Sequence, residues 1–451
     1  MKLYQRRFFK WMVDGLWLMG LALYLFAGRD KAPFHGDEST LVTMSRDYFY
    51  LLHDGDLDRV LYDEHPQNAA EQELRMINGT VGKMAMGLAA DLDGLKLEDL
   101  TEPWVWEWTM AQNEALGHKP GWKLLRATRT SSTLLTVFSV WAVFGIARLA
   151  AQRAARKRPA AYAASLIYAT TPAVLLNGRR GMMEGSHLCF ALLAILVVLL
   201  VVREQARIPI RRRALIGWTA LFAVMSGFAL ASKHTALIAV VAGFAALMTE
   251  PVIRAYAEAA TPHRKPNRRR IARWIGAVVL MTLTFVALNP AWWSDPLGMP
   301  KRVAEERRRT ISGQVNVYGG FDNVGARVVE FVEQSLSAGK PRYDEARGFS
   351  VYIADEIKQY EDSGLAGRGG NLLWGAVMLG LLSLGLSALV SRWRDSAAWT
   401  ILLWVGITAV ALLITVPFDW QRYYLPIQPP VAVIAGIGVG QAVDWLVKRG
   451  E

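Results

Sequence analysis

The stretch MMEGSHLCFALLAILVVLLVV, residues 182–202, decides the fold class. Beyond its first few residues it carries no charged side chain, and its length suits the roughly 20 apolar residues that a helix needs to cross a bilayer. Similar apolar runs recur along the 451-residue chain, of which 53% is hydrophobic. The sequence therefore predicts an all-α polytopic membrane protein with about ten transmembrane helices.

Hydropathy places the other spans on either side of this stretch. The first run begins with basic residues and ends in LFAG, which is also typical of a signal peptide. Because that run is long and contains Asp14, we favour an uncleaved membrane anchor. The sixth run is short and is expected to be tilted or broken. The expected spans are 9–28, 130–148, 160–177, 182–202, 214–232, 235–249, 274–291, 371–390, 397–416 and 424–446.

The distribution of basic residues predicts the orientation of the chain. The formal net charge is +12, and dense Lys and Arg clusters at 153–158, 207–213 and 263–273 lie in short segments between spans. Because cytoplasmic loops are enriched in Lys and Arg, both termini are expected in the cytoplasm. Nucleic-acid binding would instead need basic and aromatic groups gathered on one exposed face, so we do not expect it.

This orientation leaves two long segments, 29–129 and 292–370, on the outer side of a single membrane-embedded unit. Each contains a helical pattern of apolar residues, which predicts amphipathic helices lying on the outer membrane surface. The single cysteine, Cys189, lies in an apolar run and is expected to be a small buried hydrophobic residue. The apolar faces consist of Leu41, Met44, Tyr48 and Leu52 in the first segment, and of Val328, Phe331, Val332 and Leu336 in the second.

The stretch PFHGDESTLV, residues 33–42, places His35, Asp37 and Glu38 where the first span emerges on the outer side. Ionisable groups at a membrane rim are energetically costly, which makes them candidates for function. One interpretation is a carboxylate base or a metal ligand. The other is a helix N-cap at Asp37, which the local pattern alone favours.

More charged residues are expected at the outer ends of spans, near the same membrane level. Arg179 and Arg180 break the positive-inside pattern, and Glu184 and His187 follow them one helical turn apart. Each group also has a structural interpretation, as a local ion pair, a short loop or an aromatic belt with a snorkelling arginine. Further members are Lys233 and His234 after the fifth span, and Asp419, Arg422, Tyr423 and Tyr424 before the last.

Together, several cations and a carboxylate at one membrane level suit a phosphate that is linked to a lipid. Arginine binds phosphate as a bidentate fork and lysine as a point charge, while the lipid tail stays in the bilayer. The carboxylate would then act on a second substrate. In contrast, the basic stretch KRVAEERRRT, residues 301–310, is expected to be a solvated or headgroup-facing helix.

At these residues the chain resembles the GT-C superfamily of glycosyltransferases that use polyprenyl-phosphate-linked sugars, in particular the protein O-mannosyltransferases and the aminoarabinose transferases that act on lipid A. The resemblance rests on the order of several motifs rather than on any one of them. They are HGDES (35–39), ELRMINGTVGK (73–83), HKPGWKLLRATRTSS (118–132), RRGMMEG (179–185), NPAWWSDPLG (289–298) and WQRYYLPIQPP (420–430).

The resemblance implies that Asp37 is the catalytic carboxylate, with Glu38 beside it. It implies inversion in a single displacement, in which the base takes a proton from the acceptor hydroxyl. The phosphate leaving group then needs charge stabilisation, for which Arg179, Arg180, Arg422 and Lys233 are candidates. Glu184, His187, His234 and Tyr423 are expected to line the same substrate site.

The expected donor is a polyprenyl-phosphate-linked sugar, and the expected acceptor is a hydroxyl of a lipid, glycan or protein. The resemblance places the protein in a bacterial inner membrane with its site on the outer face. No cofactor is certain, but a divalent metal is left open because some GT-C enzymes bind one through a D-x-D motif, where this chain has D-E. The stretch EHPQNAAEQ (64–72) lacks the second proline of the mannosyltransferase H-P-P-L motif, which leaves the acceptor in doubt. A retaining mechanism stays open, and a transporter or flippase for a phosphorylated lipid or sugar is the alternative function.

Overall fold

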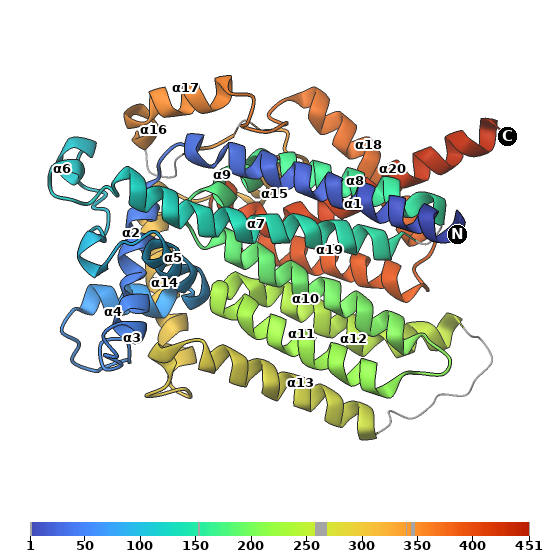
Figure 1. Ribbon diagram of the computed structural model, residues 1–451, viewed down its shortest axis with the longest axis horizontal. Helices are drawn as coiled ribbons and strands as arrows, with labels where there is room; N and C mark the ends of the chain where they lie inside the picture. Colours follow the sequence, from blue (N-terminus) through green and yellow to red (C-terminus); the bar gives the residue numbers. More distant parts are fainter. Residues whose placement is uncertain (1, 152–153, 258–267, 340, 344–347, 451) are drawn as a thin grey trace.

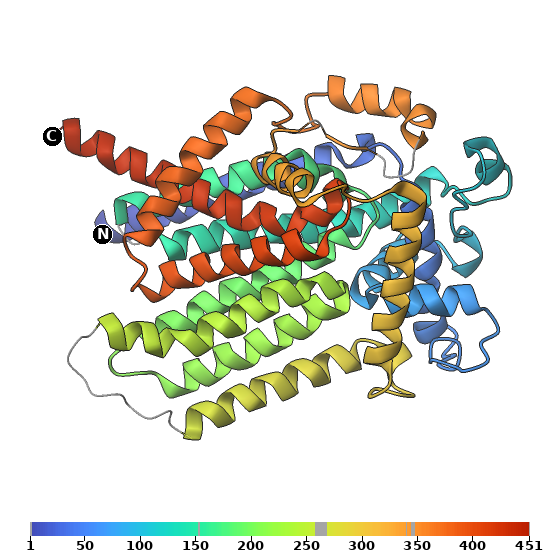
Figure 2. The same cartoon turned by 180° about the vertical axis from the view of Figure 1, so that it is seen from behind.

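The computed structural model describes residues 2–151, 154–257, 268–339, 341–343 and 348–450. Within these ranges the chain forms helices and no strand, which confirms the predicted all-α class. Long helices run side by side along the molecule, short helices gather at one end, and both termini lie at the other end (Figure 1, and from behind in Figure 2). The long helices are α1 (Lys2–Ala27), α7 (Trp122–Ala150), α8 (Ala154–Thr170), α10 (Glu184–Gln205), α11 (Arg212–Ser232), α12 (Leu237–Ala257), α13 (Arg268–Ala287), α18 (Leu372–Val390), α19 (Ser396–Thr415) and α20 (Gln428–Gly450).

In the described part of the chain, nine helices are long and apolar enough to cross a membrane, or ten if one bent pair counts as a span. That pair corresponds to the predicted span 160–177, which was expected to be a single helix and is instead bent by 62° between α8 and α9 (Pro172–Arg179). Pro172 takes the first position of α9, where its missing N–H costs nothing, while Thr171 adopts an extended conformation. The break turns Arg179 and Arg180 into the interior.

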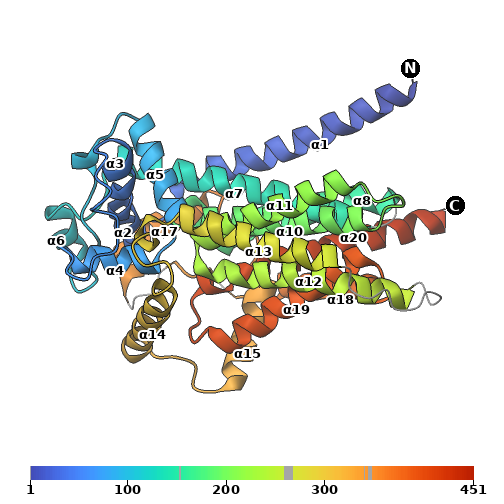
Figure 3. The same ribbon diagram turned by 90° about the horizontal axis from the view of Figure 1, so that it is seen from below.

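The bundle is held by apolar side chains from α1, α7, α8, α10 and α18 to α20. Helix α20 packs closely against α8, and this contact depends on small residues, as is common between membrane helices. A Cβ atom on Gly436 would lie 2.5 Å from the carbonyl oxygen of Ala160, so a larger residue would push the two helices apart. In the view from below, the beginning of α1 diverges from the other helices (Figure 3).

Ion pairs join the helices near the end of the molecule that carries the termini. Asp14 accepts from Arg148 at 2.6 Å and from Arg158 at 3.0 Å, and Arg156 donates to Asp444 at 2.5 Å. The basic cluster 207–213 lies at the same end (Figure 1), as the predicted topology requires, and the cluster 263–273 lies partly outside the described residues. A shared side for both termini is thus consistent with the bundle.

The first of the two long segments, residues 29–129, folds into a packed cap of short helices at the end of the bundle opposite the termini. Leu41, Met44 and Tyr48 are buried in this cap, so the prediction that their helix lies on the membrane surface is wrong. Ser45 divides that helix in two, and its apolar face points into protein. The buried ion pairs of Asp47 with Arg75 and Lys83 join α3 to α4 and α5 within the cap. The cap comprises α2 (Gly36–Met44), α3 (Arg46–Leu52), α4 (Ala69–Ile77), α5 (Thr80–Leu92) and α6 (Met110–Ala115).

The second long segment, residues 292–370, contributes α14 (Met299–Tyr318), α15 (Val324–Leu336), α16 (Phe349–Tyr352) and α17 (Ala354–Asp362). Helix α14 packs against α4, and α15 packs against α18 and α19. On α15, Phe331 and Leu336 contact the bundle core while Val328 and Val332 are exposed, so this helix is amphipathic as predicted but divides its apolar residues between two faces.

Candidate functional site

The site begins at the N-terminus of α2, where the chain leaves α1. The N-cap is His35, not Asp37: the His35 Nδ1 accepts from the backbone N–H of Asp37 at 3.1 Å. Glu38 completes a capping box, because its Oε2 accepts from the backbone N–H of His35 at 3.1 Å. The structural interpretation of Asp37 as the cap is therefore wrong, and the Asp37 side chain is left for other partners.

Glu38 is fully buried, and its carboxylate is occupied on both oxygens. Arg129 of α7 donates from Nε to Oε1 and from Nη2 to Oε2, both at 2.8 Å, and the backbone N–H of Gly181 donates to Oε1 at 2.7 Å. Burial by itself would raise the pKa of Glu38, but Arg129, Arg180 and the Gly181 N–H outweigh it and hold the pKa below its usual range. Glu38 thus ties α2 to α7 and to the turn before α10.

Asp37 faces the opposite way and ion-pairs with Arg422 of η5 (Gln421–Ile427). Its side chain keeps 26% of its surface exposed, whereas that of Glu38 keeps none. Burial would raise the pKa of Asp37, but Arg422 above all, then His35 and Lys233, lower it. Burial also lowers the pKa of His35 to about 3, so at neutral pH an ionised Asp37 stands beside a neutral imidazole.

Arg422 is positioned by stacked aromatic rings. Its guanidinium lies over Trp420 and Tyr423, at 5.8 and 5.7 Å from the ring centroids. The rings of Trp420 and Tyr423 are nearly parallel to each other, and Phe418 stacks on Trp420 with centroids 4.5 Å apart. Stacking on aromatic rings orients an arginine without removing its charge, so the Arg422 guanidinium keeps its attraction for anionic groups such as the Asp37 carboxylate.

Glu184 and Lys233 form a second ion pair, between the start of α10 and the end of α11. The Lys233 Nζ donates to the Glu184 Oε1 at 2.7 Å, and Lys233 also interacts electrostatically with Asp37. His187 lies close to both. Gly79, the N-cap of α5, packs directly against the backbone before Lys233: a Cβ atom at this position would lie 1.9 Å from the Ser232 carbonyl oxygen.

Arg307 on α14 also reaches this group, although residues 301–310 were expected to be a solvated helix. It donates to the carbonyl oxygen of Ile77 and interacts electrostatically with Tyr423 and Arg422. Burial is the largest cause that lowers its pKa, and Arg422 adds to it. His234, from η3 (His234–Ala236), interacts electrostatically with Arg307. The sequence contained one signal, because the apolar Val303 lies one helical turn before Arg307 on the same helical face, and Val303 is buried in the structure.

Arg179 and Arg180 lie deeper than predicted. The Arg179 guanidinium donates to the backbone oxygens of Tyr24 and Leu25 at 2.8 and 2.9 Å and to the Tyr360 hydroxyl at 2.8 Å. Arg180 donates to the carbonyl oxygens of Pro33 and Tyr343 at 3.0 and 2.9 Å. Because these buried groups serve backbone carbonyls, the geometry does not support the prediction that they bind phosphate. They fix the chain on either side of the candidate site.

The structure therefore divides the predicted site in two. Asp37, Arg422, Tyr423, Lys233, Glu184, His187 and His234 are brought together with Arg307, whereas Glu38, Arg179 and Arg180 brace the chain behind them. Within the described ranges, no group of three or more His, Cys, Asp or Glu side chains is arranged to hold a metal ion. A divalent metal stays an untested prediction. The arrangement offers one accessible carboxylate facing several cations.

Comparison with known proteins shows which proteins this chain resembles. The model of the dolichyl-phosphate-mannose-protein mannosyltransferase family matches residues 94–254. No curated protein is significantly similar in sequence. Among solved structures, ArnT from Cupriavidus metallidurans bound to undecaprenyl phosphate aligns over 95% of this chain and 60% of its own, with 15% identity and a TM-score of 0.51.

The archaeal oligosaccharyltransferase AglB from Archaeoglobus fulgidus, solved with an inhibitory peptide and a dolichol-phosphate, aligns over 97% of this chain and 52% of its own. Its identity is 12% and its TM-score 0.52. The chain thus spans between half and two thirds of the length of these structures. The family model and the shared fold confirm the resemblance to the GT-C group that the sequence predicted.

Proposed function

We propose that this GT-C chain is an inverting glycosyltransferase. It moves a sugar from a polyprenyl-phosphate carrier to an acceptor hydroxyl at the outer face of the membrane, in a bacterial inner membrane. The observation that carries the proposal is the placement of Asp37, an accessible carboxylate held at the bundle end beside Arg422, with Lys233 close by. The acceptor is a hydroxyl of a lipid, glycan or protein.

In the reaction, the acceptor oxygen forms a bond to the anomeric carbon while the bond from that carbon to the phosphate oxygen breaks. The acceptor proton passes to Asp37, and the electron pair leaves with the phosphate. Arg422, Lys233 and Arg307 stabilise the charge that builds on the departing phosphate. Tyr423, His187 and His234 supply polar groups around the transferred sugar.

The ion pair between Asp37 and Arg422 links donor binding to the strength of the base. With the site empty of donor, Arg422 lowers the pKa of Asp37 and so weakens it as a base. When the donor phosphate binds the Arg422 guanidinium, Arg422 stabilises the ionised Asp37 carboxylate less, and the pKa of Asp37 rises. Asp37 thereby becomes an effective base only when the leaving group is in place.

The test incubates purified protein with undecaprenyl-phosphate and dolichyl-phosphate sugars and measures release of the free carrier by mass spectrometry. Asp37→Asn should abolish release, whereas Asp58→Asn, at an exposed acid of the same outer segment, should not change it. Release by Asp37→Asn at the unaltered rate would refute the assigned base. A lipid flippase would move the intact donor across a vesicle without releasing any free carrier, which is the outcome that favours the alternative.

A further inference from the structure

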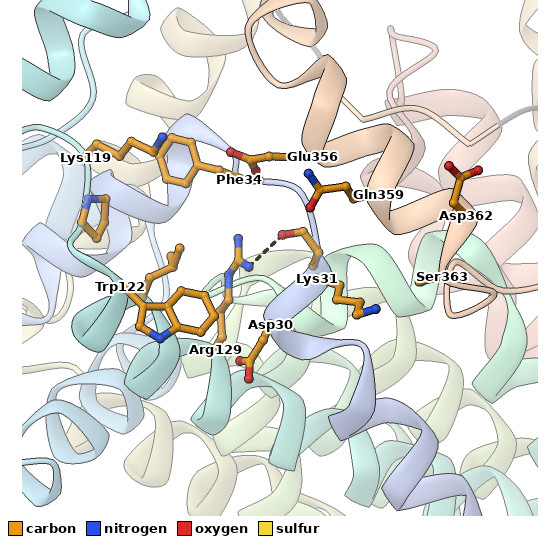
Figure 4. A pocket seen from close by; sticks show the side chains of 13 residues that line it. Asp30, Lys31, Phe34, Lys119, Trp122, Arg129, Glu356, Gln359, Asp362 and Ser363 are labelled. Carbon is orange, nitrogen blue, oxygen red and sulfur yellow. Dashed lines mark hydrogen bonds between the residues drawn. The ribbon is translucent and has the colours of Figure 1, made fainter.

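An open cavity with both polar and apolar lining lies behind the candidate site, on the other side of the segment that carries Asp37. It has a volume of about 630 Å³ and is lined by the start of α7, residues 30–34 and α17. Figure 4 shows Glu356 and Gln359 of α17 facing Trp122 and Arg129 of α7 across this space. A volume of several hundred Å³ is typical of sites for small molecules.

The charges around the cavity balance. Acidic Asp30, Glu356 and Asp362 are matched by basic Lys31, Lys119 and Arg129. Most of these groups already have partners: Arg29 binds Asp30, the backbone N–H of Phe34 donates to Glu356 at 2.7 Å, and Arg129 is clamped by Glu38. A strongly charged ligand would therefore find no excess of the opposite charge here, and the lining suits a neutral, polar ligand.

The aromatic side chain at the cavity points to the kind of neutral ligand. Trp122 is 56% exposed, which is high for a tryptophan at a concave site. A flat ring beside carboxylate and amide groups can pack against the C–H face of a sugar while those groups take its hydroxyls. We propose that this cavity binds a neutral sugar unit of the acceptor, which makes the acceptor a glycan. That assignment as acceptor rests on the proposed function.

The position of the cavity suits this role because it shares structure with the site. Phe34 lines the cavity, and Asp37 follows three residues later, so their Cα atoms are at most about 11 Å apart. Arg129 forms the cavity floor and also holds Glu38, the neighbour of Asp37. The cavity and Asp37 are thus separated by one short buried segment and are connected through the ion pair of Glu38 with Arg129.

The experiment measures sugar binding by saturation-transfer NMR on the full-length protein in detergent, with methyl α-D-mannopyranoside, maltose and cellobiose as probes. Trp122→Ala and, separately, Asp362→Asn should lower the transferred signal of at least one probe about fivefold or more. Both side chains are exposed, so neither change is expected to unfold the protein. The matched control is Trp293→Ala, at another exposed tryptophan outside the cavity, which should leave the signal unchanged.

Two further arms separate this inference from the proposed transfer reaction. Asp37→Asn should lose carrier release but keep the sugar signal, because Asp37 does not line the cavity. Inorganic phosphate should not displace the sugar. Equal signals in Trp122→Ala, Asp362→Asn and the unaltered protein would overturn the cavity proposal even if carrier release were observed, and so would complete displacement by phosphate.

Discussion

Replacing Glu38 by glutamine is expected to destabilise the protein far more than replacing its neighbour Asp37 by asparagine. Glu38 and Arg129 are both buried, with side-chain exposures of 0% and 2%. Removing one charge of a buried ion pair costs about 3–5 kcal/mol, because the other charge is left without a partner. In either orientation the glutamine NH2 group would also face two donors, an N–H of Arg129 and the backbone N–H of either Gly181 or His35.

Asp37 has a different environment, and the expected cost is smaller. It keeps 26% of its side chain exposed, and its partner Arg422 keeps 14%. Pairs with this access to water contribute about 1 kcal/mol or less. Asp37→Asn should therefore leave the free energy of unfolding within about 1 kcal/mol of the unaltered protein, while it abolishes the proposed transfer.

The free energy of unfolding is measured by titrating mixed micelles with SDS and following helix content by circular dichroism. Arg129→Met in the Glu38→Gln background provides the control, because the double variant leaves no buried charge unpaired and should recover part of the lost stability. The reasoning would be refuted if Glu38→Gln unfolded like the unaltered protein and yet lost transfer. In that case Glu38 would act on the substrate and not on the fold.

Three more predictions follow from the contacts around the site. Arg307→Ala should reduce turnover about 10- to 100-fold with little change in unfolding, because Arg307 adds charge beside Arg422. Gly79→Ala should cost about 1–3 kcal/mol, measured in the same SDS titration, since its methyl group would collide with the Ser232 carbonyl oxygen. A hydrogen bond with Glu306 raises the pKa of Glu73. This contact between α4 and α14 therefore stabilises the fold at pH values below the ordinary glutamate pKa of about 4.3, and the stabilisation is lost as the pH rises through the raised pKa of Glu73. Glu73→Gln should reduce this pH dependence of the free energy of unfolding.

The spans and the level of the charged residues could be predicted because both are local properties of the sequence. An apolar run such as 182–202 identifies a membrane helix by itself, and the order of spans then places Asp37, Lys233 and Arg422 at one end of the bundle. The bend at Pro172 was also readable, since proline favours the first position of a helix. Hydropathy missed it because the apolar run continues across the break.

The partners of buried charges could not be predicted in the same way. Arg129 pairs with Glu38 across 91 positions, and Arg179 donates to Tyr360 across 181 positions. The local sequence does not distinguish an arginine that donates to backbone carbonyl oxygens from one that binds a phosphate. Arg307 was missed for a related reason: its helix is strongly basic, and a charged helix is usually solvated unless another element, here α4, covers one of its faces.

The different environments of Asp37 and Glu38 follow from helix geometry. Successive residues on an α-helix point about 100° apart, so in the first turn of α2 one carboxylate faces Arg422 while the next faces Arg129. The capping box and the bidentate pair fix the backbone of this turn. The backbone of Asp37 is thereby held in place, while its carboxylate pairs with Arg422. In the proposed reaction Glu38 is therefore a positioning residue, because a rigid neighbour reduces the conformational freedom that the proposed base would otherwise lose in each turnover.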